Sequence, residues 1–160
     1  MWFRRDLRLS DHPALHEAVR LGGPDGVLPV FVLDDALLAP CGPARAAYLA
    51  ESLRQLDASL GGGLVIRRGP PEHALVELAG ELGSSEVVIT ADFAPGGMAR
   101  DASVEAALAS AGVSLHRRSS PYAVDPGTIR GDSGAPLKVF TAFRRRFDQL
   151  DAFIVLGEPD

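Results

Sequence analysis

The chain has 160 residues, a formal net charge of −5 and an apolar fraction of 46%. This length favours one domain with a substantial core, and the composition excludes a disordered or membrane-spanning class. The negative charge opposes binding to a nucleic-acid backbone, so we expect function to come from a local site. The first residues lack the pattern of a secretory leader and Cys41 has no second cysteine to pair with, so we expect a cytoplasmic protein.

Short apolar runs bounded by Gly or Pro alternate with segments of helical periodicity. The runs are continuously apolar, which is typical of strands buried on both faces of a parallel sheet. Strands are expected at 2–3, 27–33, 64–66, 86–90 and 113–116, and helices at 13–21, 43–60, 71–82 and 98–111. This alternation predicts a doubly wound α/β domain, with helices on both faces of a five-stranded parallel sheet in the order 3-2-1-4-5.

The opening sequence "WFRRDLRLSDHP" indicates a strand end, a charged loop and a helix start. Trp2 is expected in the core, and Ser10 or Asp11 is expected to cap the helix that Pro13 begins. In an open α/β sheet the ligand crevice lies at the carboxyl ends of the strands, where the strand order reverses. The charged loop leaves the first strand at this edge and is expected to face "ADFAPGG", which follows the fourth strand.

The charged side chains around this crevice have two interpretations, a ligand site or an ion-pair network that fixes the loop. The network is favoured because structural networks of this kind are more common than charged ligand sites. Its expected members are Arg4, Asp6, Arg8, Arg100 and Asp101. We expect at least one of Asp6 and Arg8 to pair with Arg100 or Asp101 across the crevice.

Three further patterns each have a functional and a structural interpretation. His12 and His16 are one helical turn apart, but no third ligand is spaced to join them, so we expect a solvated pair and no metal site. Gly96 and Gly97 lie between a strand and a helix, where free amides can bind a phosphate, although two glycines more often form a plain turn. The basic run at 144–146 is more typical of a solvated helix face than of a DNA contact.

Five segments resemble one known family in the family's own order. "WFRRDLRLSDHPAL" closely resembles the first-strand signature of the DNA photolyase and cryptochrome family, and "ARAAYLAESLRQLDASLGG", "LVIRRGPP", "APGGMARDASVEAAL" and "LKVFTAFRRRF" resemble later segments of the same domain. The resemblance implies that residues 1–150 form the family's N-terminal α/β domain. It leaves 151–160 as an unmatched tail, and the helical domain that holds FAD is absent from these residues.

In this family the N-terminal domain holds an antenna chromophore, for example a deazaflavin, a folate or FMN, whose excitation energy passes to FAD in the helical domain. The resemblance implies a slot with Phe31, Leu33 and Leu38 as walls and Asp34, Arg45 and Asp92 as polar anchors. Phe31 and Leu33 fit plain sheet core equally well. The chromophore is expected between the loops that follow the first, second and fourth strands.

The sequence departs from the family pattern at three places. His12 stands where many members have Asn, residues 94–96 read Ala-Pro-Gly where the family usually has Glu-Pro-Tyr, and Ala142 replaces a proline. Of the acidic residues that approach a deazaflavin in this loop, only Asp92 is present. We therefore expect a weakened antenna pocket.

Three classes of function stay open. They are the antenna domain of a deoxyribodipyrimidine photolyase, the N-terminal domain of a cryptochrome photoreceptor, and a free-standing flavin- or nucleotide-binding module. The implied partners are a C-terminal FAD-binding helical domain and, through that domain only, damaged DNA, with no membrane and no metal. Because the FAD-binding and lesion-binding residues belong to the helical domain, we expect the parent protein to be a carbon–carbon lyase and these residues alone to be no catalyst.

Overall fold

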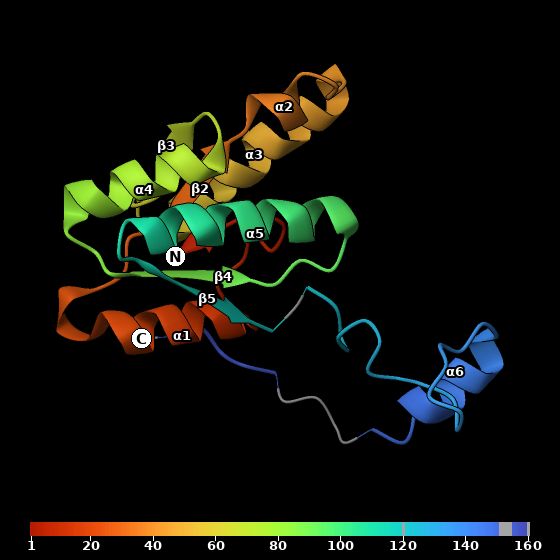
Figure 1. Ribbon diagram of the computed structural model, residues 1–160. Helices are drawn as coiled ribbons and strands as arrows, with labels where there is room; N and C mark the ends of the chain where they lie inside the picture. The colour runs from red at the N-terminus through yellow and green to blue at the C-terminus, as the bar shows by residue number, and fades with distance from the viewer. Residues whose placement is uncertain (120, 151–154, 160) are drawn as a thin grey trace.

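The computed structural model describes residues 1–119, 121–150 and 155–159, and its strands and helices alternate along the chain (Figure 1). The strands are β1 (Trp2–Phe3), β2 (Val30–Leu33), β3 (Val65–Arg68), β4 (Glu86–Thr90) and β5 (Ser114–Arg118). The helices are α1 (Pro13–Gly22), α2 (Asp35–Leu38), α3 (Pro43–Ser59), α4 (Pro71–Leu82), α5 (Pro95–Ser110) and α6 (Phe140–Phe147), with a short 3-10 helix, η1, at Gly23–Asp25. The predicted α/β alternation is confirmed.

Prolines account for the largest shifts in the element bounds. Pro29 has no amide hydrogen to donate to a ladder, so β2 begins at Val30 rather than at Val27. Helix α5 begins at Pro95 rather than at Met98, because the fixed backbone of proline suits the first helical turn. Prolines begin α1, α3 and α4 in the same way.

The strands are parallel, but they form two sheets, in the orders β1-β2-β3 and β4-β5. The predicted continuous sheet in the order 3-2-1-4-5 is therefore not formed. β1 lies beside β4, yet its only ladder among the described strands is with β2, where Trp2 pairs with Val30 and Phe3 with Phe31. A two-residue strand offers too few backbone groups to hold ladders on both of its edges.

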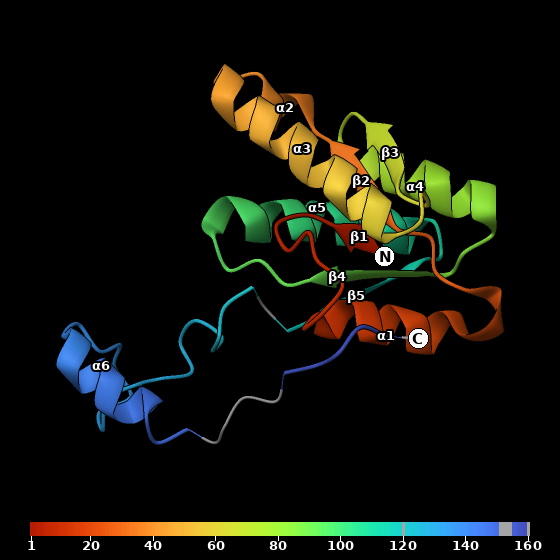
Figure 2. The same ribbon diagram turned by 180° about the vertical axis from the view of Figure 1, so that it is seen from behind.

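Helices cover both faces of the strands, as predicted (Figures 1 and 2). Successive strand residues point to opposite faces. One core therefore contains Trp2, Val30, Val32, Val87 and Ile89 with residues of α4 and α5, and the other contains Phe3, Phe31 and Val88 with residues of α1 and α3. Trp2 lies in the core, as expected from the sequence.

The start of α1 differs from the prediction at its cap. His12, and neither Ser10 nor Asp11, caps the helix, since its Nδ1 accepts a hydrogen bond from the Leu15 amide at 3.1 Å. The His12 side chain is fully buried, and its ring packs edge-on against Phe3 with the ring centroids 5.3 Å apart. The predicted solvated histidine pair is therefore wrong.

Part of the predicted tail at 151–160 lies outside the described residues. Its described part contacts the start of α1. The Asp11 amide donates to the Leu156 carbonyl at 2.8 Å, and a ring nitrogen of His16 lies 2.9 Å from the Gly157 carbonyl. The tail therefore returns to the first helix of the domain.

Helix α6 lies apart from the sheets in both views (Figures 1 and 2). None of its described residues is buried, and its basic run at 144–146 is exposed. Phe143 and Phe147 stack on each other with their ring centroids 6.0 Å apart. No helix among the described residues is long and apolar enough to cross a bilayer.

The amino group of Met1 should make stability depend on pH. It donates to the Leu28 carbonyl at 2.9 Å, and burial lowers its pKa from 8.0 to about 6. Between these values the unfolded chain binds more protons, so the free energy of unfolding should rise from pH 6 to pH 8, by about 2–3 kcal/mol. Urea unfolding across this range measures the rise. Acetylation of the amino group should remove it, and equal slopes with and without acetylation would contradict the prediction.

Candidate functional site

The loops after β1 and β4 meet at the carboxyl ends of the strands, where the sequence predicts the crevice. The Arg4 guanidinium donates to the carboxylate of Asp101, on α5, and to the backbone carbonyl of Thr90, the last residue of β4. The Arg4 and Asp101 side chains are only 8% and 3% exposed. This buried contact ties β1 to β4 and α5 at the place where the ladder between the two sheets is missing.

A second group of polar contacts lies beside the first. The Thr90 hydroxyl donates to the Asp6 carboxylate, and Nε2 of His12 lies 3.2 Å from the same carboxylate, out of line for a hydrogen bond. Because Nδ1 of His12 accepts the Leu15 amide, the ring carries its proton on Nε2. Burial lowers the pKa of His12 despite the opposing charge of Asp6, so the ring is neutral at pH 7.

Asp92 is enclosed by cations. Its carboxylate lies 3.4 Å from the Arg5 guanidinium and 3.3 Å from that of Arg100, accepts the Ala94 amide at 3.0 Å, and is 3% exposed. Burial raises the pKa of Asp92, but the Ala94 hydrogen bond and the charges of Arg5, Arg4 and Arg100 together bring it below its ordinary value. The carboxylate is therefore ionised, and its partners come from this loop, from the loop after β1 and from α5.

The indole ring of Trp2 supports the arginines of this cluster. The guanidinium carbon of Arg4 lies 4.9 Å from the ring centroid and that of Arg100 lies 5.8 Å from it. Cations over an indole face are attracted by its quadrupole, most strongly when they are shielded from water. The tryptophan of the opening motif therefore serves both the core and the charged crevice.

The expected pairing of Asp6 or Arg8 with Arg100 or Asp101 is wrong. The chain turns at this point, where the Arg8 amide donates to the Asp6 carbonyl at 2.8 Å. As a result Arg8 is exposed and its guanidinium donates to the Asp11 carbonyl at 2.7 Å. The arginine that directly follows β1 makes the contact across the crevice instead.

The glycine pair at the start of α5 has a packing role. A Cβ atom at Gly97 would overlap the carboxyl group of Asp92, whereas the space beside Gly96 is open. The Asp92 carboxylate thus lies against the first turn of α5, where a phosphate would otherwise bind. This contact argues against the phosphate interpretation, and it also explains why the second glycine is needed.

The residues expected to hold a chromophore divide into two groups. Phe31 is buried in the core between β2 and the helices α1 and α3, and Asp92 is held by its arginines. The other four, which are more accessible, are Leu33, Asp34, Leu38 and Arg45, at the end of β2, in α2 and at the start of α3. Asp34 caps α2 by accepting the Ala36 amide at 2.9 Å.

The volumes of the cavities bear on the expected chromophore position. A cavity between 4–6 and 90–92 measures only about 10 Å³. One of about 560 Å³ lies at the opposite, amino-terminal edge of the strands. Small-molecule pockets usually measure about 300–1,000 Å³, so the cavity between 4–6 and 90–92 is too small to hold a chromophore. Among the described residues no group of three or more His, Cys, Asp or Glu side chains is arranged to hold a metal.

A comparison with protein families matches residues 1–156 to the model of the DNA photolyase family. The chain belongs to this family. A deoxyribodipyrimidine photo-lyase of Agrobacterium fabrum is 37% identical over 154 residues, which cover 94% of this chain and 32% of that protein. The DNA photolyase resemblance of the sequence is thereby confirmed, and the chain spans about a third of the length of this photo-lyase and of two others that it matches.

Two solved structures show that the DNA photolyase family shares this fold. A bacterial class III photolyase from Agrobacterium tumefaciens superposes with a TM-score of 0.86 at 35% identity, covering 99% of this chain and 33% of the other. A cryptochrome from Synechocystis superposes with a TM-score of 0.88 at 22% identity, covering 99% and 35%. At that identity the second likeness shows the fold alone.

The Arg4 contact should carry much of the stability of this photolyase-family domain. In Arg4→Met, the buried Asp101 carboxylate loses its partner, so the free energy of unfolding should fall by about 3–5 kcal/mol. Arg4→Met combined with Asp101→Leu should cost less than the sum of the single changes, because no charge is left unpaired.

Urea unfolding of the three variants measures these changes. The matched control is Arg54→Met, which breaks an exposed pair with Glu51 on α3 and should cost less than about 1 kcal/mol. Equal costs for Arg4→Met and Arg54→Met would contradict the prediction.

Gly97 and Gly96 provide a second test with a built-in control. Gly97→Ala should lower the free energy of unfolding by about 1–3 kcal/mol, because the new methyl group would displace the Asp92 carboxyl group. Gly96→Ala should raise it by about 0.4–1 kcal/mol, since the methyl group meets open space in a helix. Thermal unfolding of both variants gives the comparison, and the same sign for both would refute the packing role.

Proposed function

We propose that this chain is the antenna-chromophore domain of a deoxyribodipyrimidine photolyase, which repairs pyrimidine dimers in DNA under light. The observation that supports it is the 37% identity, over 94% of the chain, to a protein named as such a photolyase. A class III photolyase with the same fold at 35% identity adds to this support. On this proposal the parent protein is a carbon–carbon lyase, and the chemistry belongs to FAD in a helical domain outside these residues.

The two alternatives have less support. A cryptochrome of Arabidopsis thaliana is 31% identical over 91% of this chain, which is less than the 37% identity to the photo-lyase, so a signalling function has less support. A free-standing nucleotide-binding module is not favoured either, because the photo-lyases of Agrobacterium fabrum and Halobacterium salinarum that contain the same domain are about three times longer than this chain. The glycine pair that would have served such a module packs on a carboxylate.

On this proposal the chromophore, a deazaflavin, folate or FMN, lies against α2 and the start of α3. There it absorbs near-ultraviolet or blue light and supplies excitation energy to FAD. Leu33 and Leu38 would offer it an apolar surface, and Asp34 and Arg45 would orient its polar groups. Phe31 would act as the floor beneath this surface, and Asp92 would hold the loop after β4 in place, each as a positioning residue.

The proposed partners follow from the same reasoning. The helical domain with FAD would pack against this domain, and damaged DNA would bind to the helical domain only, because the net charge of −5 opposes a phosphate backbone here. The proposed compartment is the cytoplasm.

Chromophore binding to the purified chain tests the proposal. We expect saturable binding of one of three probes, FMN, a 5-deazaflavin or a reduced folate, followed by fluorescence polarisation. Arg45→Ala should weaken it at least about tenfold, the equivalent of about 1.4 kcal/mol for a lost charge-assisted contact.

The control is Arg54→Ala, an exposed arginine on the same helix beyond the proposed site, which should leave the affinity unchanged. Equal losses in Arg45→Ala and Arg54→Ala would refute the placement. Absence of saturable binding by all three probes would refute the antenna function.

A further inference from the structure

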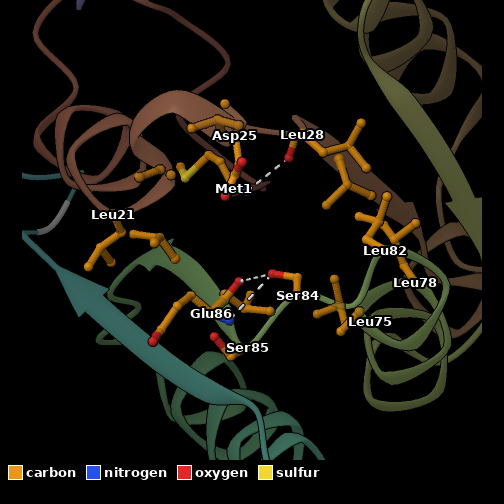
Figure 3. Close-up of a pocket in the computed structure, with 18 of the residues that line it drawn as sticks. Met1, Leu21, Asp25, Leu28, Leu75, Leu78, Leu82, Ser84, Ser85 and Glu86 are labelled. Atoms are coloured by element: carbon orange, nitrogen blue, oxygen red, sulfur yellow. Dashed lines mark hydrogen bonds between the residues drawn. The ribbon is translucent and has the colours of Figure 1, made fainter.

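Helix α1 has different surroundings at its two ends. Its last turn lines the cavity of about 560 Å³ at the amino-terminal edge of the strands, where Figure 3 shows Leu21. Its first turn lies at the carboxyl edge and is capped by His12, whose side chain is fully buried. The proposed antenna site makes no use of this histidine. The segment 155–157 returns to the domain beside this cap.

The ring of His12 has two polar neighbours but is aligned with only one of them. Its Nδ1 accepts the Leu15 amide at 3.1 Å, whereas its Nε2 lies 3.2 Å from the Asp6 carboxylate without the alignment of a hydrogen bond. The edge-on contact with Phe3 helps to hold the ring in this orientation. A fully buried ring nitrogen with no hydrogen-bond partner among the described residues is an exception that needs a physical account.

A second proton changes which neighbour suits the ring. The neutral ring carries its proton on Nε2, so a proton taken from solvent can bind only at Nδ1. A protonated Nδ1 is a donor and cannot accept the Leu15 amide. The imidazolium is instead attracted by the Asp6 carboxylate, and a hydrogen bond between groups of opposite charge is about twice as strong as a neutral one. The neutral and the protonated ring therefore favour different orientations.

Burial and the charged side chains of the loop after β1 act on the ring. Burial has the largest effect and lowers the pKa of His12 from 6.5, while the charge of Asp6 opposes this and that of Arg8 adds to it. Phe3 of β1 and Thr90 of β4, which contact the ring and Asp6 respectively, carry no charge. Because the unfolded chain binds the proton more readily, the stability that the neutral ring contributes is present above about pH 6.5. It is lost as the pH falls through the lower pKa of the folded chain.

The cap is joined to the tail through one residue. Asp11, which directly precedes His12, has a left-handed backbone with a φ of 50°. Its amide donates to the Leu156 carbonyl at 2.8 Å, and its carboxylate accepts the Leu156 amide at 3.4 Å. One turn beyond the cap, a ring nitrogen of His16 lies 2.9 Å from the Gly157 carbonyl. The segment 155–159 runs beside α1 in both views (Figures 1 and 2), so a change in the first turn of α1 changes the site that holds this segment.

We propose that His12 is a proton-operated latch on the first helix. With a neutral ring, His12 caps α1 and Asp11 holds the segment 155–157. With a proton bound at Nδ1, the ring turns to pair with Asp6, the cap is lost and the segment 155–157 leaves α1. The latch is independent of the proposed antenna function, because it uses none of the residues of the proposed chromophore surface.

A pH titration of the full chain by nuclear magnetic resonance tests the latch. Between about pH 8 and about pH 5, the resonances of the His12 ring nitrogens and of the Leu15 and Leu156 amides should change together. Their common midpoint should lie below 6.5. Protection of the Leu15 amide against hydrogen exchange should fall at least about threefold across this transition, because its side-chain acceptor is lost.

The matched control is His12→Asn, since asparagine also caps helices but does not titrate. This variant retains the Met1 amino group and His16, and both amide resonances should lack the transition. Asp6→Asn removes the charge that favours the imidazolium, so the midpoint should move lower by about one pH unit. Circular dichroism first establishes that each variant folds. If Asp6→Asn does not fold, the titrations of the unchanged chain and of His12→Asn still decide the question.

Three outcomes would overturn the proposal. A transition that persists in His12→Asn would assign it to another titrating group. A His12 ring that stays neutral until the whole chain unfolds would show that it is a cap and no latch. A transition at the Leu15 amide without one at the Leu156 amide would show that the tail is held independently of the cap.

Discussion

The buried contact of the Arg4 guanidinium with Asp101 and with the Thr90 carbonyl fixes how the two halves of the domain meet. No ladder joins β1 to β4, so backbone hydrogen bonds do not set their spacing at the crevice. The core and the packing of α4 on α5 bring the halves together, but apolar contact is not directional. A bidentate arginine between a carboxylate and a carbonyl is directional, although desolvation offsets much of its gain in energy.

Local chemistry explains which elements the sequence could predict. Apolar runs and flanking Gly or Pro residues specify strands and helices through burial and backbone geometry, and these elements are present. Whether adjacent strands form a ladder depends on the positions of their backbone N–H and C=O groups. A hydrophobic pattern carries no information about these positions, so the missing ladder between β1 and β4 is not predictable from the sequence. The cap formed by His12 is not predictable from the sequence because a histidine cap is uncommon, and its burial arises from contacts with Phe3 and Asp6.

The candidate site shows the same division. The arginines and aspartates of the opening loop were recognised as a cluster because they follow a strand at the crevice edge. The partners of these side chains are not predictable, because a turn at 6–8 directs Arg8 toward Asp11. As a result Arg4 makes the contact with α5. The role of Gly97 depends on a carboxylate five residues earlier that folds against it, and no local pattern signals this contact.

The carboxyl and amino-terminal ends of the strands differ in how the joint between β1 and β4 is closed, and this difference matters for an antenna. The efficiency of excitation transfer depends on the orientation of the chromophore relative to its acceptor, and the proposed surface, which would set this orientation, begins at the end of β2. This strand has ladders with β1 and β3, and Asp34 caps the helix that follows it, so the surface does not depend on the open joint between β1 and β4. At the carboxyl ends that joint is closed by the arginine cluster, whereas at the amino-terminal edge the cavity leaves it open.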